Sequence, residues 1–121
     1  MSGKILIVDD EQAMCEMLEL DLGQRGFKTE WYVDANPALE RLQQETFDAA
    51  LVDLRMPEMD GIEFCGKARS MGVDLPVVVV TGFGSVDAAV EAMRAGAYDF
   101  IAKPLDMDVL ELALSRAVRQ S

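Results

Sequence analysis

The chain has 121 residues, which is enough for one domain with a substantial core and too few for two. Its 22 acidic and 11 basic side chains give a formal net charge of -11 at pH 7, and such a surface repels nucleic-acid phosphates, so direct nucleic-acid binding is not expected. The longest aliphatic run, 77–80, is far shorter than the roughly 20 residues of a membrane span, and the N-terminus lacks a signal-peptide pattern, so a cytoplasmic chain without membrane contact is predicted.

Five short runs rich in aliphatic, β-branched or aromatic residues are predicted to be β-strands. The first, third and fourth lack polar alternation, which is typical of central parallel strands covered on both faces. In chain order the five runs are 5–8, 29–33, 49–52, 77–80 and the weaker 98–101.

Two helices are predicted in the first half of the chain. Residues 12–24 carry apolar side chains four positions apart, and Gly26 follows as a stop signal. Asn36 and Pro37 match an N-cap and the first residue of a helix that ends near Glu45.

Three further helices are predicted in the second half. A turn at Asp60 and Gly61 precedes a helix through Ala68, Ser85 is expected to cap the next helix, and the last covers about 107–119. Helical spacing predicts the buried faces of the last two helices, which are Val86, Ala89, Val90 and Met93 in one and Leu110, Ala113, Leu114, Ala117 and Val118 in the other.

The sulfur-containing side chains are predicted to be structural. Cys15 and Cys65 are far apart, and the chain has no His and no CxxC pair, which excludes the usual zinc ligand sets. Reduced, buried thiols are expected. Met14 and Met93 lie at inner helical positions and are predicted to fill the core.

The order of elements is strand then helix, five times over. Alternation of this kind with short connections predicts an α/β fold with a parallel sheet, right-handed crossovers and helices on both faces. In such open sheets, ligands bind beyond the carboxyl ends of the strands. That edge is where functional residues are expected.

Polar side chains follow four of the five predicted strands at this edge. Asp9 and Asp10 follow the first, Asp53 the third, Thr81 the fourth and Lys103 the fifth. A single Asp at such a position is commonly only a turn or cap residue. Five polar groups that converge on one edge indicate a site.

The chemistry of this set favours phosphoryl transfer to a carboxylate. Carboxylates about 4 Å apart repel by roughly 4 kcal/mol per pair, so three of them require a cation, and Mg²⁺ suits a site with few carboxylates and retained waters. Lys103 supplies a second positive charge, and the Thr81 hydroxyl can donate to an added phosphoryl group. Asp53 ends the middle strand and is the expected nucleophile.

Four stretches of the chain resemble the receiver family of two-component response regulators. The similarity extends from Lys4 to about Val118. It implies a flavodoxin-like (βα)5 three-layer sandwich with a five-stranded parallel sheet of order 2-1-3-4-5. The four stretches are 5–11, 52–61, 80–82 and 102–104.

The resemblance also implies a role for each acidic residue. Asp53 would accept a phosphoryl group from the phosphohistidine of a sensor histidine kinase. Asp10, Asp53 and the backbone carbonyl of Arg55 would ligate Mg²⁺, with Asp9 acting mostly through water and Mn²⁺ able to substitute.

The remaining receiver positions are implied to read the phosphoryl group. Thr81 and Lys103 would bind its oxygens, and the peptide bond between Lys103 and Pro104 would be cis. Phe100 lies at the family's switch aromatic, whose ring would move inward when Thr81 turns toward the phosphate. Tyr98 is predicted to be a packing residue.

Residues 81–93 and 96–100 resemble receivers of the nitrogen-regulator type, which are found ahead of an ATPase that activates transcription. Residues 1–121 would then be the receiver domain of a longer regulator. The surface formed by the fourth helix, fifth strand and fifth helix would signal to an output domain or partner by changing homodimer contacts, with Val109 and Leu112 as candidates. A bulky Phe83 favours slow loss of the phosphoryl group.

Two other functions share part of this chemistry or this fold. A haloacid-dehalogenase-like phosphatase also uses an Asp nucleophile with Mg²⁺, but it requires a second Asp where this chain has Arg55. A flavodoxin-like electron carrier requires a hydroxyl-rich phosphate loop where this chain has Asp9, Asp10 and Glu11. The predicted protein is therefore no enzyme, but a phosphoacceptor that assists only its own phosphorylation and dephosphorylation.

Overall fold

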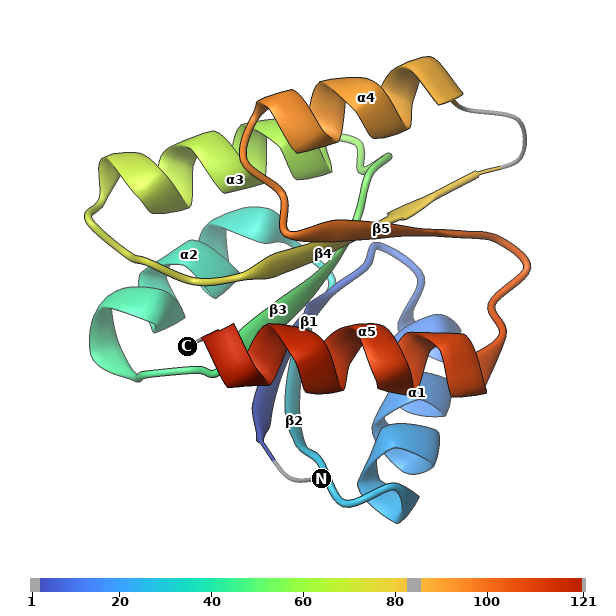
Figure 1. The fold of residues 1–121 in the computed structure, drawn as a ribbon. Helices are drawn as coiled ribbons and strands as arrows, with labels where there is room; N and C mark the ends of the chain where they lie inside the picture. The colour runs from blue at the N-terminus through green and yellow to red at the C-terminus, as the bar shows by residue number, and fades with distance from the viewer. Residues whose placement is uncertain (1–2, 83–85, 121) are drawn as a thin grey trace.

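The fold consists of five strands that alternate with five helices (Figure 1). The computed structural model describes residues 3–82 and 86–120, so Ser85 and Phe83 lie outside the described residues. The predicted elements are all present. Their bounds are β1 Lys4–Val8, α1 Gln12–Gln24, β2 Lys28–Tyr32, α2 Ala35–Gln44, β3 Ala49–Asp53, α3 Gly61–Ser70, β4 Val77–Thr81, α4 Val86–Arg94, β5 Asp99–Ala102 and α5 Met107–Gln120.

The strands form one parallel sheet in the order β2-β1-β3-β4-β5, as predicted. Val8 of β1 pairs with Val52 of β3, and Asp53 at the end of β3 pairs with Val80 of β4. The order of the strands reverses between β1 and β3. Because ligands of such sheets bind at the carboxyl ends near this reversal, the end of β3 is the position of interest.

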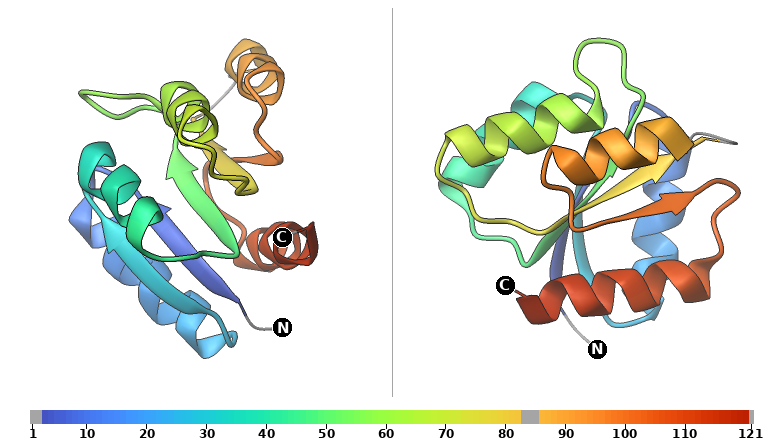
Figure 2. Two further views of the ribbon diagram at one scale, coloured as in Figure 1. Left: turned by 90° about the vertical axis from the view of Figure 1, so that its left-hand side faces the viewer. Right: turned by 45° about the horizontal axis from the view of Figure 1, so that its top comes forward.

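Helices cover both faces of the sheet, so the molecule has three layers (Figure 2). Successive strand residues point to opposite faces, which places Leu6 and Val8 in one core and Ile5 and Ile7 in the other. The first core is completed by α2, α3 and α4, and the second by α1 and α5. Burial on both sides explains why β1, β3 and β4 are continuously apolar.

The start of α2 differs from the prediction. The helix begins at Ala35 after Asp34, so the prediction of Asn36 as N-cap is wrong. Asn36 and Pro37 lie in the first helical turn instead. Proline is tolerated there because the first N–H groups of a helix have no intrahelical acceptor.

The predicted buried face of α4 is also wrong at three of its four positions. Val86 is 71% exposed, and Val90 and Met93 are each 43% exposed. The helix packs through the small residues Ala89 and Ala92, which let its backbone approach the sheet. Apolar residues at helical spacing share a face, but the spacing does not say whether that face is covered.

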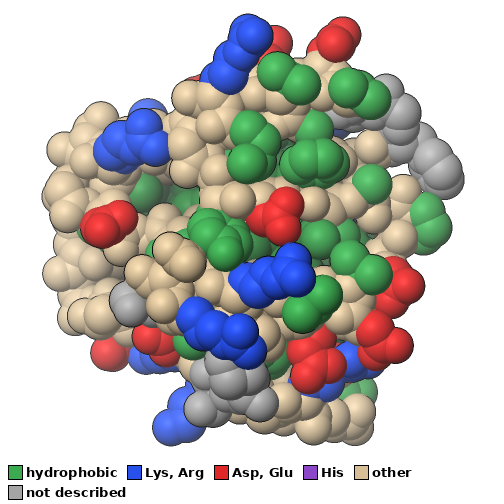
Figure 3. All heavy atoms as spheres, in the orientation of Figure 1, with side chains coloured by type: hydrophobic (Ala, Val, Ile, Leu, Met, Phe, Trp, Pro, Cys, Tyr) green, Lys and Arg blue, Asp and Glu red, His purple; other side chains and the backbone are tan. Residues whose placement is uncertain are grey.

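The exposed side chains of α4 form an apolar surface together with β5. We define the α4–β5 patch as Val86, Val90, Met93 and Phe100, which line one shallow hollow with Ala89 and Arg94. Hydrophobic side chains gather over these two elements in Figure 3. On neighbouring α5, Val109 and Leu112 are about half exposed, as expected from their positions off its inner stripe. In the described part of the chain, no helix is both long and apolar enough to cross a membrane.

Candidate functional site

Asp53 is fixed by the sheet at the carboxyl end of β3. It is the last residue of the strand, and its side chain is almost fully buried. The next residue, Leu54, continues the ladder by donating its N–H to the Val80 carbonyl at 2.9 Å. The backbone on both sides of Asp53 is therefore held, and the carboxylate has a defined position.

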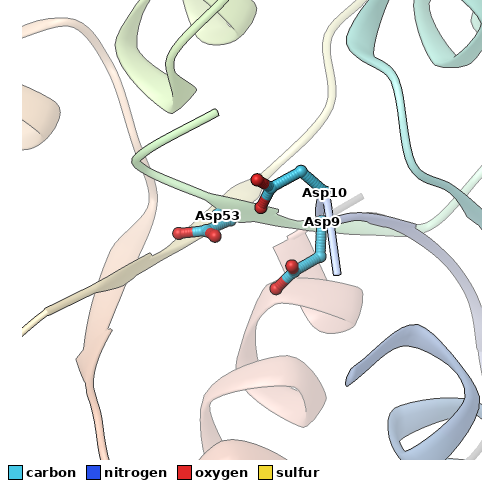
Figure 4. Close-up of side chains that lie close together, drawn as sticks. All are labelled: Asp9, Asp10 and Asp53. Atoms are coloured by element: carbon cyan, nitrogen blue, oxygen red, sulfur yellow. The ribbon is translucent and has the colours of Figure 1, made fainter. Parts of the chain in front are cut away.

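Three carboxylates meet at this point (Figure 4). One oxygen from each of Asp9, Asp10 and Asp53 lies within 4.8 Å of the other two. Asp9 and Asp53 are buried, whereas Asp10 is exposed. The topology explains the meeting, because β1 and β3 are neighbours in the sheet and Asp9 and Asp10 directly follow β1.

Backbone N–H groups orient both buried carboxylates. The Asp9 Oδ1 atom accepts the N–H of Glu11 at 2.9 Å, and the Asp53 Oδ1 atom accepts the N–H of Arg55 at 3.2 Å. Each contact spans two residues, as in the turns that Asp commonly makes. In both residues the Oδ2 atom remains for another partner.

Burial makes negative charge costly in this site. It raises the pKa of Asp9 to about 6, with the Glu11 N–H acting in the opposite direction and the nearby Asp53 charge adding to the rise. Burial also raises the pKa of Asp53, against the lowering effects of Lys103 and of the Arg55 N–H. Fully ionised carboxylates therefore need more positive charge nearby.

Lys103 supplies only part of that charge. Its Nζ atom lies 3.8 Å from Asp53 Oδ2. One cation cannot balance three carboxylates, and the donor set consists of oxygens alone. Closely spaced carboxylate oxygens are the donors that Mg²⁺ and other hard divalent cations prefer, so these residues fit such an ion.

Thr81 and Lys103 lie at the same edge and are tied through the backbone. Thr81 is the buried last residue of β4, and its carbonyl accepts the N–H of Lys103 at 2.8 Å. The peptide bond between Lys103 and Pro104 is cis, as the resemblance implies. The structure thus brings the polar groups after β1, β3, β4 and β5 to one edge, as predicted.

Phe100 occupies a different place from these residues. It lies on β5, opposite Val79 of β4, and its side chain is 41% exposed. It is therefore part of the α4–β5 patch and not of the carboxylate cluster. Tyr98 packs against the second core, as predicted.

Gly61 shapes the loop after Asp53, a contribution that the sequence prediction did not include. Its N–H donates to the Leu54 carbonyl at 2.9 Å, and a Cβ atom added to it would lie 3.2 Å from the Asp53 carbonyl oxygen. The Asp60 side chain caps α3 by accepting the Glu63 N–H at 2.8 Å. A glycine lets α3 begin directly against the end of β3, which closes the loop that carries Arg55.

A separate hollow in the surface lies away from this edge, between the end of α3, the turn after α4 and the end of α5. Its volume is about 720 Å³, and Arg69, Asp74 and Gln120 are among its lining residues. None of the residues predicted to bind metal or phosphate lines it. The site is therefore defined by its carboxylates and not by the size of a cavity.

The comparisons with known proteins agree with this geometry. The family model described as "Response regulator receiver domain" matches residues 5–115. The transcriptional regulatory protein ZraR of Klebsiella oxytoca is 41% identical over 98% of this chain and 27% of its own length. The regulatory protein AtoC of Escherichia coli is 40% identical over 97% of this chain and 25% of its own length. The chain thus spans about a quarter of these relatives.

A solved structure supports the same family. The crystal structure described as FixJ-N covers 98% of this chain and 94% of its own, with a TM-score of 0.93 and 36% identity. The chain therefore belongs to the response regulator receiver domain family. Its relatives are of the nitrogen-regulator type, as the sequence predicted. It is a module of phosphorylation-dependent signalling, and the phosphatase alternative is not supported.

The raised pKa of Asp9 predicts how stability depends on pH in the metal-free protein. Protonated Asp9 stabilises the fold below about pH 4, the ordinary carboxyl range, and this contribution is lost as the pH rises through about 6. Relative to Asp9→Asn, wild type should lose up to about 3 kcal/mol of unfolding free energy across that range.

Urea denaturation with a chelator present, at several pH values between about 4 and 8, measures this difference. Asp74→Asn, in the hollow away from the site, serves as the control. If the difference in unfolding free energy between wild type and Asp9→Asn stays constant with pH, or changes in the opposite direction, the prediction is contradicted.

Proposed function

We propose that Asp53 is the residue that takes up the phosphoryl group, from a phosphohistidine of a sensor histidine kinase and with Mg²⁺ bound beside it. The observation that carries this proposal is the convergence of the Asp9, Asp10 and Asp53 carboxylates within 4.8 Å, at the carboxyl edge of the sheet. The proposed ligands are Asp10, Asp53 and the backbone carbonyl of Arg55, with Asp9 acting mostly through water. Mn²⁺ is expected to substitute.

The contacts of Asp53 support its role as nucleophile. Its Oδ1 atom is engaged by the Arg55 N–H, while Oδ2 faces the Lys103 ammonium group. A carboxylate oxygen of Asp53 attacks phosphorus, the N–P bond of the phosphohistidine breaks, and the electron pair of that bond stays on the imidazole. The product is an acyl phosphate. The bound cation would neutralise charge on the phosphoryl oxygens during the transfer.

Thr81 and Lys103 are proposed to hold the transferred group. The Lys103 ammonium already lies beside Asp53, and it can move its hydrogen bonds from the carboxylate to a phosphoryl oxygen. The Thr81 hydroxyl is at the end of the neighbouring strand and can donate to the same group. These residues assist the domain's own phosphorylation and dephosphorylation, and no other substrate is proposed.

The α4–β5 patch is the proposed route by which phosphorylation is read. When Thr81 turns toward the phosphate, the ring of Phe100 is proposed to move inward, which changes the exposed apolar surface. Val90, Met93 and Phe100 are each about 40% exposed, so this surface is available to a partner. We propose that it forms a phosphorylation-linked homodimer together with α5, in the cytoplasm, and that a longer regulator uses this dimer to control transcription.

The first test is labelling by a small phosphodonor such as acetyl phosphate with Mg²⁺. Wild type should gain one alkali- and hydroxylamine-labile phosphoryl group, whereas Asp53→Asn should lose labelling by at least about 100-fold because the amide is not a nucleophile. Intact-mass spectrometry measures the added group. The control Asp74→Asn should label as wild type does, and full labelling of Asp53→Asn would refute the proposed acceptor.

The second test is the effect of Mg²⁺ on stability. An ion that binds only the folded state at ten times its dissociation constant contributes about 1.4 kcal/mol, so the thermal midpoint should rise by on the order of 5 °C. Asp10→Ala should abolish this rise, and it should make the metal-free protein more stable because one repelling carboxylate is gone. Scanning calorimetry with chelator or with Mg²⁺ distinguishes the two effects. An unchanged wild-type midpoint in millimolar Mg²⁺ counts against the site.

The third test concerns the dimer. Phosphorylated wild type should sediment as a dimer at concentrations where the unphosphorylated protein is a monomer. Val90→Asp places a charge in the α4–β5 patch and should weaken dimerisation by at least about tenfold. Leu20→Asp is the matched control, since Leu20 is 66% exposed on α1, which covers the other face of the sheet. A phosphorylated wild type that remains monomeric overturns this part of the proposal.

A further inference from the structure

Asp9, which directly follows β1, makes hydrogen bonds through three of its polar atoms. Its N–H donates to the Tyr32 carbonyl at 3.1 Å, and its Oδ1 atom accepts the Glu11 N–H at 2.9 Å. Its carbonyl oxygen accepts the thiol S–H of Cys15 at 3.3 Å. Of its polar atoms, only Oδ2 has no hydrogen bond to another described residue.

The thiol contact comes from a residue that the proposed function does not use. Cys15 lies in the first turn of α1 and is completely buried, and its own N–H donates to the Glu11 carbonyl at 3.1 Å. The described residues provide no other hydrogen-bond donor to the Asp9 carbonyl. Because Asp9 is also buried, its carbonyl depends on this thiol.

The contact fixes the turn that connects the two acidic residues to α1. A thiol is a weak donor, but here both residues are buried, and the bond joins Asp9, which directly follows β1, to the first turn of α1. With the carbonyl held, the peptide plane between Asp9 and Asp10 is held as well, since a peptide unit is planar. That plane sets the direction in which the Asp10 side chain leaves the backbone.

We propose that Cys15 is a positioning residue for the cation site, which it serves by holding the Asp9–Asp10 peptide so that both carboxylates face Asp53. This inference rests on the proposed function. Figure 4 shows the side chains of Asp9 and Asp10 directed from this short turn toward the space beside Asp53. Cys15 is not among the proposed ligands of the cation or of the phosphoryl group, and it acts through the backbone of Asp9.

Loss of the thiol should therefore weaken Mg²⁺ binding more than it lowers the stability of the fold. Removal of a group that orients a metal ligand commonly costs roughly 10- to 100-fold in affinity, and a weak donor should cost less. For Cys15→Ala we expect a rise in the Mg²⁺ dissociation constant of about three- to tenfold. Cys15→Ser keeps a donor of similar size and should bind Mg²⁺ within about twofold of wild type.

The chain offers a matched control in its other buried thiol. Cys65 lies on α3 in the first core and is likewise free and buried, but it makes no hydrogen bond to the acidic turn in the described structure. Cys65→Ala removes the same atoms as Cys15→Ala. If both variants lose similar thermal stability, a difference in Mg²⁺ affinity between them reports on positioning and not on packing.

The experiment is a Mg²⁺ titration of metal-free wild type, Cys15→Ala, Cys15→Ser and Cys65→Ala by isothermal calorimetry, with thermal midpoints measured alongside. Weakened binding confined to Cys15→Ala, with recovery in Cys15→Ser, is the expected result. Equal affinity of Cys15→Ala and wild type overturns the positioning role and leaves the proposed function standing. Weakening that is equal in Cys65→Ala, or that Ser does not restore, overturns it as well. A wild type that binds no Mg²⁺ refutes the cation site itself, and this inference with it.

Discussion

The central physical constraint in this structure is the electrostatic repulsion among three carboxylates that the fold holds close together. Three carboxylates meet within 4.8 Å because β1 and β3 are adjacent and end together. Nothing in the backbone allows Asp9 and Asp53 to separate, since each belongs to a strand end that is hydrogen-bonded to its neighbours. Burial raises the pKa of both residues, and the Lys103 charge, which lowers both pKa values, offsets that rise only in part. The site is therefore ready to take up positive charge or a proton.

The rest of the molecule keeps this cluster in place. Two apolar cores, one on each face of the sheet, hold the strands that carry the charged residues. Local contacts then orient the individual groups, including the N–H groups of Glu11 and Arg55 and the close approach of Gly61 to the end of β3. Because these contacts hold the backbone rigidly, the carboxylates stay close together, whereas freely mobile groups of like charge would move apart.

The same framework connects the site to the surface. The Thr81 carbonyl accepts the Lys103 N–H, so a hydrogen bond joins the end of β4 to the residue that follows β5. Phe100 lies three residues before Lys103 on β5, and its ring forms part of the α4–β5 patch. Under the proposed function, a phosphoryl group on Asp53 would thus have a short covalent and hydrogen-bonded path to an exposed apolar surface. The small contact residues of α4 leave that surface uncovered.

The sequence alone determined the order of elements, the parallel sheet and the polar residues of the site, because continuous apolar runs and strand-end polar groups are local patterns. It did not determine which face of α4 is covered, since Val90 and Met93 have the spacing of buried residues and yet are exposed. Nor did it place the start of α2, because Asp34 and Asn36 are both good capping residues. Only the tertiary structure revealed that the Cys15 thiol meets the Asp9 carbonyl. That contact depends on how the first turn of α1 returns over the end of β1, and no spacing of residue types encodes its geometry.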